Sequence, residues 1–485
     1  MQTFVQVLSE EECHQVHERS LKILVNTGVR VESTRARAIL HAAGASVDED
    51  GHIVRIPSSL VEQVLHAAPK QFSLSGRRPG WTIDLNKGDC TLLSDGGALF
   101  VYDAEKGERR LATHMDWVNS TLLVDALDEI GLYWWMVQES KQTTSIGEFV
   151  SYWHEVFTYT SKHVQDSTDN PVQTRWLLEI LQTVFGDQKT IRHLHPFSFL
   201  ICPLSPLTIE GPYTDAYLET IGWDIPVAIM PMPLMGTTAP GRLISTIVLG
   251  NCEVLSFLCL AQAAAPGTPV IYAPSLAVAE PHSGRFGSGA VEHALLGAAT
   301  TEMGRYYGLP VEASSGGTDH HIPGIQAGYE RALNWMLPTL SWPDILVGPG
   351  LLSGSTVLSF EQLLIDIEVF NRCQRLHRGI ECDEGNWLDC VIEKVGPGGN
   401  FLAQRSTREG MRSGEWYLST LGFQDTYETW MATRPDILAE ARQRIRHILE
   451  THRPLPLDET VEKELKFIEK RAREMDPAEE IRVPR

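Results

Sequence analysis

The residues best suited to chemistry lie in one short polar segment late in the chain. Positions 314–321 read SSGGTDHH and follow an apolar run over 309–313. The catalytic candidates are Asp319, His320 and His321. The aspartate could neutralise a cationic group, and either histidine could bind a carboxylate. The competing interpretation is structural, with the aspartate as the N-cap of the next helix and both histidines on the surface.

A second candidate feature is the aromatic stretch 131–138, which reads GLYWWMVQ. Aromatic ring faces with a nearby carboxylate hold a cationic group well. Strand alternation sends the two tryptophans to opposite sides, so at most one lines a barrel interior. The alternative for each aromatic side chain is packing between helix and sheet. The substrate-binding candidates are Trp134, Trp135, Gln138, Tyr102 and Tyr272, with Gly316 and Gly317 allowing close approach of the backbone to a ligand.

These candidates need a scaffold, and the chain from about residue 90 onward predicts one. Helix-length segments separate eight short apolar runs, at 91–93, 130–137, 163–165, 197–202, 226–230, 269–272, 309–313 and 344–348. Several runs follow Pro and end in Gly, Pro or Ser, as strands before βα loops do. The count favours an α/β fold of the TIM (β/α)8 barrel type over a doubly wound open sheet. Catalytic residues are then expected at the carboxyl ends of the strands.

The rest of the chain frames this barrel. We expect an N-terminal α+β extension over 1–88, a TIM-barrel catalytic domain over 89–400 and a C-terminal helical segment over 401–485. In the last segment, 436–452 and 457–475 are amphipathic. They are typical of a terminal helical cap on the barrel, with a partner-docking helix as the alternative.

Composition and charge exclude several functions. The 485 residues include 62 acidic and 41 basic side chains, for a net charge of −21. That excess argues against binding to nucleic acid or to anionic membranes. The apolar stretch 243–266 contains Asn251 and Glu253, which favours a buried helix over a membrane span. No signal peptide is expected, and eight scattered cysteines without a CxxC indicate a reduced, cytoplasmic protein.

Several segments together resemble the trimethylamine methyltransferase family, which contains pyrrolysine enzymes and relatives without that residue. Those segments are LVNTGVRV at 24–31, MPMPLMG at 230–236, GLPV at 308–311, QAGYE at 326–330 and GPGG at 396–399. In this order they span nearly the whole chain. The resemblance implies a TIM barrel and methyl transfer from an amine to the cobalt of a corrinoid held by a separate protein. It also implies that the active-site strand ends near 314–321.

The absence of pyrrolysine from the sequence narrows the class of amine expected as substrate. All 485 positions are standard amino acids, so the chain resembles the branch without pyrrolysine. A quaternary ammonium releases a neutral tertiary amine without activation, whereas a tertiary amine needs help to leave. We therefore expect a betaine-like quaternary amine, although the sequence does not name it. The nucleophile in such a reaction is the cobalt, so no nucleophilic side chain is required.

Cofactor and partner expectations follow from the same resemblance. We expect a corrinoid-binding protein as partner, a quaternary or tertiary amine as substrate, and no metal or organic cofactor held tightly by this chain; a homo-oligomer is left open. Positions 319–324 fit the Asp-x-His-x-x-Gly pattern of cobalamin-binding domains, but lack its downstream Ser-x-Leu, so we interpret the match as coincidence. Two rivals stay open, namely a barrel enzyme of another class and a non-catalytic amine-binding protein.

Overall fold

The computed structural model describes residues 2–48, 52–138, 145–314 and 317–475, and eight short parallel strands form its centre. Their hydrogen-bonded order is β15-β13-β11-β10-β9-β6-β18-β17, and a parallel bridge between Tyr272 and Val311 joins the two ends. Each strand falls on one of the eight predicted runs, so the TIM-barrel prediction is confirmed. The strands are β6 (Thr91–Leu93), β9 (Ile130–Tyr133), β10 (His163–Asp166), β11 (Phe197–Ile201), β13 (Val227–Ile229), β15 (Val270–Tyr272), β17 (Glu312–Ser314) and β18 (Ile345–Val347).

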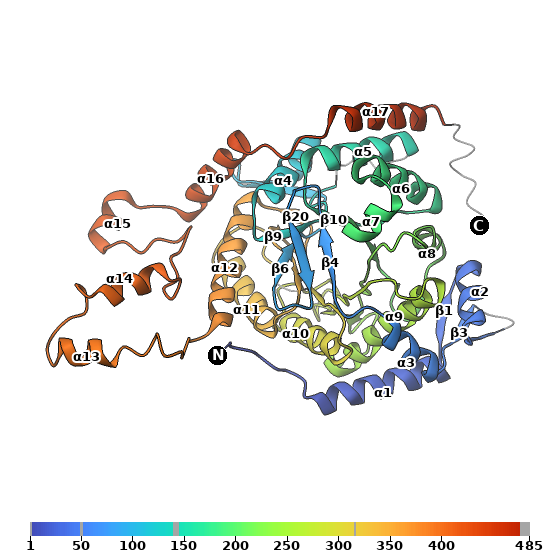
Figure 1. The fold of residues 1–485 in the computed structure, drawn as a ribbon, viewed down its shortest axis with the longest axis horizontal. Coiled ribbons are helices and arrows are strands. Elements are labelled where there is room, and N and C mark those ends of the chain that lie inside the picture. The colour runs from blue at the N-terminus through green and yellow to red at the C-terminus, as the bar shows by residue number, and fades with distance from the viewer. Residues whose placement is uncertain (1, 49–51, 139–144, 315–316, 476–485) are drawn as a thin grey trace.

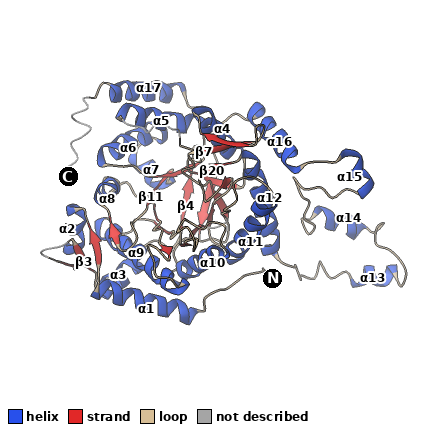
Figure 2. Cartoon of the chain, turned by 180° about the vertical axis from the view of Figure 1, so that it is seen from behind, coloured by secondary structure: helices blue, strands red, loops and turns tan. Residues whose placement is uncertain are grey.

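A ring of helices surrounds the barrel (Figures 1 and 2). Several begin at residues that satisfy their first backbone N–H groups, such as the capping boxes at Thr113 and Ser145. The long apolar helix over 243–264 is mostly buried, as expected for a core helix. The ring consists of α4 (His114–Ala126), α5 (Ile146–Tyr159), α6 (Pro171–Phe185), α7 (Gln188–Leu194), α8 (Gly211–Leu218), α9 (Leu243–Ala264), α10 (Val291–Tyr306), α11 (Ile325–Ser341) and α12 (Phe360–Arg378).

A hairpin closes the amino end of the barrel. Strands β4 (Phe72–Ser75) and β5 (Thr82–Leu85) pair antiparallel, and their side chains Leu74 and Leu85 are fully buried. Both pack against the inward-facing residues Leu93, Leu132, Leu200, Ala228, Met230, Ile271, Ala273, Ile345 and Val347. Because this end is plugged with apolar side chains, access to the interior is left to the carboxyl ends of the strands.

Additional strands decorate the loops after the barrel strands. One sheet has the order β19-β20-β7-β8 and builds on the loops that follow β6 and β18. A second pairs two short strands from the loops after β13 and β15. These six strands are β7 (Phe100–Asp103), β8 (Glu108–Leu111), β19 (Leu351–Leu352), β20 (Val357–Leu358), β14 (Leu234–Met235) and β16 (Ala277–Val278).

The N-terminal extension shares its core with the barrel. Its sheet has the order β12-β1-β3-β2, where β12 (Thr208–Ile209) comes from the loop after β11. All three of its helices, α1, α2 and α3, pack on α9. The remaining elements of the extension are α1 (Glu10–Asn26), β1 (Val29–Val31), α2 (Thr34–Ala42), β2 (Ser46–Val47), β3 (Ile53–Arg55) and α3 (Ser58–Ala67).

The C-terminal part has five helices among its described residues. The last two pack on the barrel, and the three before them do not. Helix α16 (Ile437–Thr451) packs on α4 and α12, and α17 (Glu459–Arg473) packs on α5 and α6, as their amphipathic patterns predict. The segment before them carries α13 (Asp389–Val395), α14 (Arg405–Arg412) and α15 (Tyr427–Thr433), and projects away from α12 (Figure 1).

Candidate active site

A chain of polar side chains crosses the interior of the barrel. Strand alternation turns His163 and Gln165 of β10, Ser198 of β11 and Glu312 of β17 inward, and all four are fully buried. Glu312 pairs in register with Ile345, which belongs to the inward-facing apolar cluster. Polar groups in a barrel core are stable only where hydrogen bonds satisfy them.

The hydrogen bonds form a continuous relay. Gln165 Nε2 donates to Glu312 Oε2 at 2.8 Å, and Ser198 Oγ donates to Gln165 Oε1 at 3.0 Å. His163 Nε2 lies 2.9 Å from Ser198 Oγ, and its Nδ1 lies 2.9 Å from the carbonyl oxygen of His195. The other carboxyl oxygen, Glu312 Oε1, is buried without a hydrogen-bond partner in the described part of the chain. One acceptor at the end of the relay therefore has no partner among the described residues.

Burial determines where the protons of this relay lie. It raises the pKa of Glu312 to about 7 and lowers the pKa of His163 to about 3. A neutral His163 donates from Nδ1 to the backbone carbonyl, so its Nε2 must accept from the Ser198 hydroxyl. The hydroxyl then accepts from the amide nitrogen of Gln165, and the amide oxygen accepts from a protonated Glu312.

The donor directions given above describe the other arrangement, with a carboxylate at one end and an imidazolium at the other. Turning the Gln165 amide end for end converts one arrangement into the other, because its two ends are an acceptor and a donor of similar size. Burial penalises both charges of the ionised arrangement, so the neutral one has the lower energy. Glu312 is therefore protonated in the empty barrel at pH values below about 7.

The carboxyl end of the interior is accessible to water. Trp134 packs against the inward-facing cluster and is half-buried, and the side chain of Cys202 is exposed. The surrounding protein, with the carboxyls of Glu312 and Glu210, nevertheless raises the pKa of Cys202 to about 12. A thiol that is both exposed and surrounded by protein is expected in a recess. We call this region, with Glu312 beneath it, the inner compartment.

Asp95 adds a second carboxyl at this end of the barrel. It follows β6, is half-buried and accepts a hydrogen bond from Ser355 Oγ at 2.9 Å. Burial raises the pKa of Asp95, while Ser355 and the positive charge of Arg331 lower it. Asp95 and Trp134 thus follow the carboxyl ends of β6 and β9, an acid and an aromatic ring that together favour a cation, whereas Glu312 is the first residue of β17.

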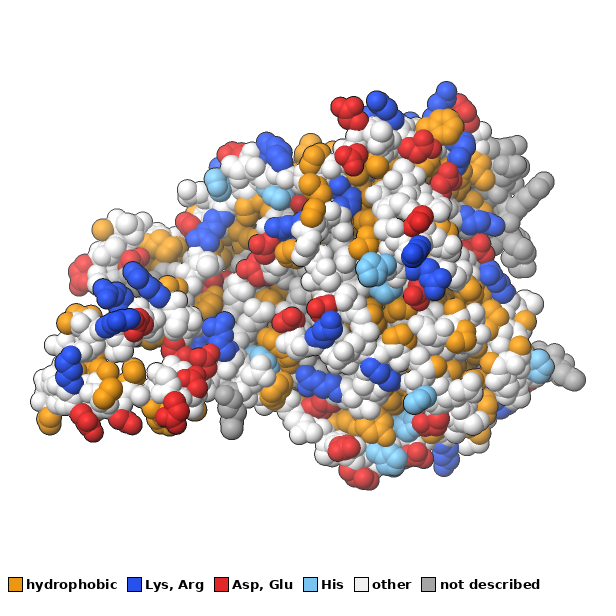
Figure 3. Space-filling model, viewed as in Figure 1, with side chains coloured by type: hydrophobic (Ala, Val, Ile, Leu, Met, Phe, Trp, Pro, Cys, Tyr) orange, Lys and Arg blue, Asp and Glu red, His pale blue; other side chains and the backbone are white. Residues whose placement is uncertain are grey.

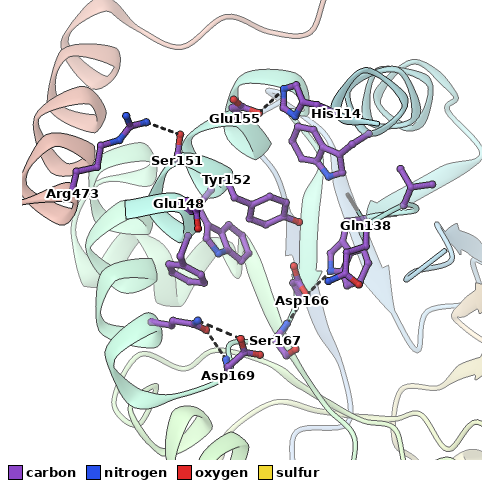
Figure 4. A pocket seen from close by; sticks show the side chains of 16 residues that line it. His114, Gln138, Glu148, Ser151, Tyr152, Glu155, Asp166, Ser167, Asp169 and Arg473 are labelled. Carbon is purple, nitrogen blue, oxygen red and sulfur yellow. Dashed lines mark hydrogen bonds and ion pairs between the residues drawn. The ribbon is translucent and has the colours of Figure 1, made fainter. Parts of the chain in front are cut away.

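A separate pocket lies outside the barrel wall, between the exits of β9 and β10 and helices α4, α5 and α17 (Figure 4). Its volume is about 420 Å³. Trp135 Nε1 donates to Asp166 Oδ1 at 3.1 Å, and burial raises the pKa of Asp166 to about 7. We call this the outer pocket; its aromatic lining consists of Trp117, Trp135, Phe149, Tyr152 and Trp153.

The structure therefore separates the two predicted tryptophans. Trp134 lies inside the barrel and Trp135 lines the outer pocket together with Gln138. Both surroundings combine aromatic rings with an acid, the arrangement expected to hold a quaternary ammonium. The inner compartment lies at the barrel mouth, where TIM-barrel enzymes carry their active sites, whereas the outer pocket does not.

The described residues 317–321 decide one of the interpretations weighed for the polar segment and leave the catalytic one a prediction. Helix α11 starts after its N-cap Gly324, so Asp319 is not a helix N-cap and that interpretation is wrong. Asp319 is half-buried, and its Oδ1 accepts from the backbone N–H of Ser288 at 3.1 Å. A Cβ on Gly317 would lie 2.4 Å from Ser288 Cβ, so that glycine is required for contact with the same loop. Gly316 lies outside the described residues.

Both histidines of the segment make local contacts. His320 Nδ1 lies 2.7 Å from the carbonyl oxygen of Ile322, and His321 Nδ1 lies 2.7 Å from Ser353 Oγ in the loop after β18. The backbone N–H of Ser353 also donates to the carbonyl of His320. These contacts join two loops at the barrel mouth, which places the histidines near its rim.

The two predicted tyrosines lie in different surroundings. Tyr272 is buried outside the barrel wall, where its hydroxyl donates to Asn251 Oδ1 at 2.9 Å, because Ile271 occupies the inward position of β15. Placing Tyr272 at the substrate site was therefore wrong. Tyr102 is half-buried on the loop sheet and packs against a small apolar cluster formed by Ala327, Leu352 and Val357, so its part in substrate binding stays a prediction.

Sequence reasoning missed the relay. Gln165 and Glu312 stand inside two of the runs predicted as buried strands, where a polar residue is unusual. That contrast was the available signal, and it is stronger than the clustering of polar residues in a loop. Across the described residues, no three His, Cys, Asp or Glu side chains are placed to hold a metal ion.

The family of the chain follows from its match to known proteins. Residues 2–476 match the family model described as trimethylamine methyltransferase. This chain belongs to the trimethylamine methyltransferase family. Since all its residues are standard amino acids, it is a member of that family without pyrrolysine.

Two similar proteins are named for different methyl donors. A trimethylamine methyltransferase of Desulfitobacterium hafniense (strain DSM 10664 / DCB-2) is 30% identical over 464 residues, covering 95% of this chain and 92% of the relative. A glycine betaine methyltransferase of Desulfitobacterium hafniense (strain Y51) is 29% identical over 471 residues, covering 97% and 98%.

Among solved structures, the monomethylamine methyltransferase of Methanosarcina barkeri is similar over 90% of this chain and 98% of its own, with 11% identity and a TM-score of 0.46. A dihydropteroate synthase from Coxiella burnetii covers 62% of this chain and 97% of its own, with 13% identity and a TM-score of 0.37. At these TM-scores the likenesses add nothing to the family assignment.

Proposed function

We propose that this protein transfers a methyl group from a betaine-like quaternary amine to the Co(I) corrinoid of a separate, cytoplasmic corrinoid protein. Membership of a methyltransferase family is the observation that carries methyl transfer. The glycine betaine methyltransferase among the relatives and the absence of pyrrolysine support a quaternary substrate. A quaternary nitrogen is already activated, because it leaves as a neutral amine.

The reaction is an in-line displacement at the methyl carbon. The electron pair of Co(I) forms the new cobalt–carbon bond, and the pair of the broken C–N bond remains on nitrogen, so no proton is transferred. The chain therefore has to bind the cation, orient one methyl group toward the barrel opening and exclude water. Because the corrinoid arrives on another protein, the methyl donor must lie where a second protein can reach it.

The inner compartment meets these requirements better than the outer pocket. It lies on the barrel axis beside the carboxyl ends of the strands, and it combines Trp134 with Asp95 and the free oxygen of Glu312. Bringing a positive charge beside Glu312 favours loss of its proton, which leaves a carboxylate to pair with the ammonium. Desolvated pairing of this kind selects a cation over the neutral product, so it also promotes product release.

Two neighbouring residues provide the test of this site. Trp134→Leu alters the inner compartment and Trp135→Leu alters the outer pocket, while both remove one indole from the same strand exit. Isothermal titration with glycine betaine should show at least a tenfold loss of affinity in Trp134→Leu and less than a threefold change in Trp135→Leu. The reverse result would move the amine to the outer pocket.

The second candidate function is that of a non-catalytic amine-binding protein. The acidic and aromatic side chains of the inner compartment fit this function equally well. Proton NMR of glycine betaine incubated with this protein and a reduced corrinoid protein separates the two. The enzyme converts the N-trimethyl signal into that of the N-dimethyl product, and does so only when the corrinoid protein is present. Binding without product would establish the non-catalytic alternative.

A further inference from the structure

The segment 379–434 is an arm that stands away from the barrel. Its helices α13, α14 and α15 contain no buried residue. Figure 1 shows it projecting from the end of α12, and orange apolar side chains are visible across it in Figure 3. A helix without a buried face gains little stability from packing, so the arm is expected to be covered by another surface.

The base of the arm is nevertheless fixed. Ser419 Oγ donates to Glu368 Oε1 at 2.6 Å, and the backbone N–H of Thr420 donates to Glu368 Oε2 at 3.1 Å. Leu421 is buried, and Arg375 donates to the carbonyl oxygen of Glu415. These contacts hold residues 415–421 of the arm against α12, so the outer helices have a defined position relative to the barrel.

The arm exposes enough apolar surface for a stable interface. Its six exposed aromatic side chains alone offer on the order of 600 Å², from the usual area of such side chains and their exposed fractions. With the aliphatic side chains, the arm exceeds the roughly 800 Å² per partner of a standard interface. The exposed set comprises Ile380, Trp387, Leu388, Ile392, Phe401, Leu402, Met411, Trp416, Leu418, Phe423, Tyr427, Trp430 and Met431.

A second uncovered apolar surface lies on the barrel. Ile325, Tyr329 and Leu333 follow one another at four-residue spacing on α11, and Ile325 is 91% exposed. Val291 and Leu295 are exposed at the same spacing on α10, which packs against α11. We call these five residues, with Ile322 beside them, the α10–α11 face. Scattered apolar side chains are ordinary on a surface, but a contiguous helical stripe indicates a contact site.

We propose that the arm of one copy of this chain packs on the α10–α11 face of a second copy. Each copy carries both surfaces, so one head-to-tail contact repeated around a closed ring covers both. Extensive apolar interfaces are typical of permanent assemblies. A corrinoid protein must associate and dissociate in each catalytic cycle. If it were the partner, this apolar surface would be exposed to water whenever the two proteins were apart.

Charge favours the same partner. Helix α14 carries Arg405, Arg408 and Arg412 against a single acid, Glu409. The whole chain has a net charge of −21, so acidic side chains that complement this basic helix are in excess on a second copy. Complementary charge of this kind directs association and selects the partner.

The mass of the full-length protein in solution tests the proposal. Light scattering coupled to size exclusion should give a multiple of 54.1 kDa for the wild type. The arm variant Trp387→Asp/Leu402→Asp and the face variant Ile325→Asp/Tyr329→Asp should each give the single-chain mass. All four side chains are exposed, so the monomer fold should persist, which circular dichroism melting checks. Phe467→Asp on α17 is the matched control, because it is exposed outside both surfaces.

Mixing the two variants gives the sharpest result. The face variant keeps an intact arm and the arm variant keeps an intact face, so the mixture should form a dimer of twice 54.1 kDa, with each partner at equal abundance. A wild type that is a single chain at micromolar concentration would overturn the proposal. So would an arm variant whose mass equals that of the wild type, or one that loses only its binding to a corrinoid protein.

Discussion

Gln165 Nε2 lies 2.8 Å from Glu312 Oε2, and the two residues belong to β10 and β17, which stand on opposite sides of the closed barrel. Their hydrogen bond therefore spans the interior. It links the buried carboxyl of Glu312 to a relay that finishes at the backbone carbonyl of His195, near the plugged end. Two of the four relay members can gain or lose a proton, so the relay makes ligand binding sensitive to pH.

The first prediction concerns that pH dependence. Burial raises the pKa of Glu312 to about 7, and a cationic amine binds better to the carboxylate than to the acid. Affinity for glycine betaine should therefore rise as the pH increases through about 7, and fall about tenfold per pH unit well below it. Glu312→Gln should remove this dependence in isothermal titrations. The matched control is Glu253→Gln, because Glu253 is also buried with a pKa of about 7 but lies on α9 outside the barrel. A wild type whose affinity is constant with pH contradicts the prediction.

The second prediction concerns stability. Glu312 keeps its proton in the folded chain up to about pH 7, whereas the unfolded chain loses it near its ordinary pKa of about 4.3. Between these values the folded state binds more protons, so the free energy of unfolding falls as pH rises, by up to roughly 3 kcal/mol from this group. Glu312→Gln should gain stability relative to wild type above pH 7 and lose that advantage near pH 4. Urea unfolding at both pH values measures it, and equal stability differences at the two would count against a protonated Glu312.

The third prediction concerns the loop that precedes α11. Asp319 accepts the backbone N–H of Ser288, and an asparagine oxygen can accept the same bond. Asp319→Asn should therefore leave melting and amine affinity nearly unchanged, while Asp319→Ala should cost about 1 kcal/mol of stability. A tenfold loss of affinity in the asparagine variant would show that the charge of Asp319, rather than its contact with the neighbouring loop, serves the substrate.

The fourth prediction uses the exposed thiol at the barrel mouth. Protein surroundings raise the pKa of Cys202 to about 12, so at neutral pH it is almost entirely a thiol and reacts slowly. Methylmethanethiosulfonate should modify it with a rate that increases with pH up to about 12, and glycine betaine should protect it. Mass spectrometry of the labelled peptide gives the rate. Fast labelling at neutral pH would contradict the raised pKa of Cys202. No protection by the amine would place the ligand away from this thiol.

The barrel strands were predictable because apolar runs bounded by Pro, Gly or Ser reflect the local geometry of the backbone. Each of the eight apolar runs became a barrel strand, and alternation correctly separated Trp134 from Trp135. Alternation does not say which residues of a strand face inward. The sequence therefore could not show that Ile271, and not its neighbour Tyr272, faces the barrel interior. The N-cap interpretation of Asp319 failed because its hydrogen-bond partner, Ser288, belongs to a different loop.

The relay and the arm were out of reach for other reasons. The contact between Gln165 and Glu312 depends on strands 147 residues apart meeting across a closed barrel, which local patterns do not encode. The arm was included in the expected barrel domain and helical segment, because its apolar residues resemble those of a core. Only the packed structure shows that they face solvent.

The central claim is that this chain demethylates quaternary amines and delivers the methyl group to a corrinoid protein. The most direct measurement is the visible spectrum of a reduced corrinoid protein mixed with this protein and a panel of amines. We predict conversion of the Co(I) spectrum to that of methyl-Co(III) with a quaternary amine such as glycine betaine, and none with trimethylamine or dimethylamine. Conversion with trimethylamine alone, or no conversion with any quaternary amine, would contradict the account.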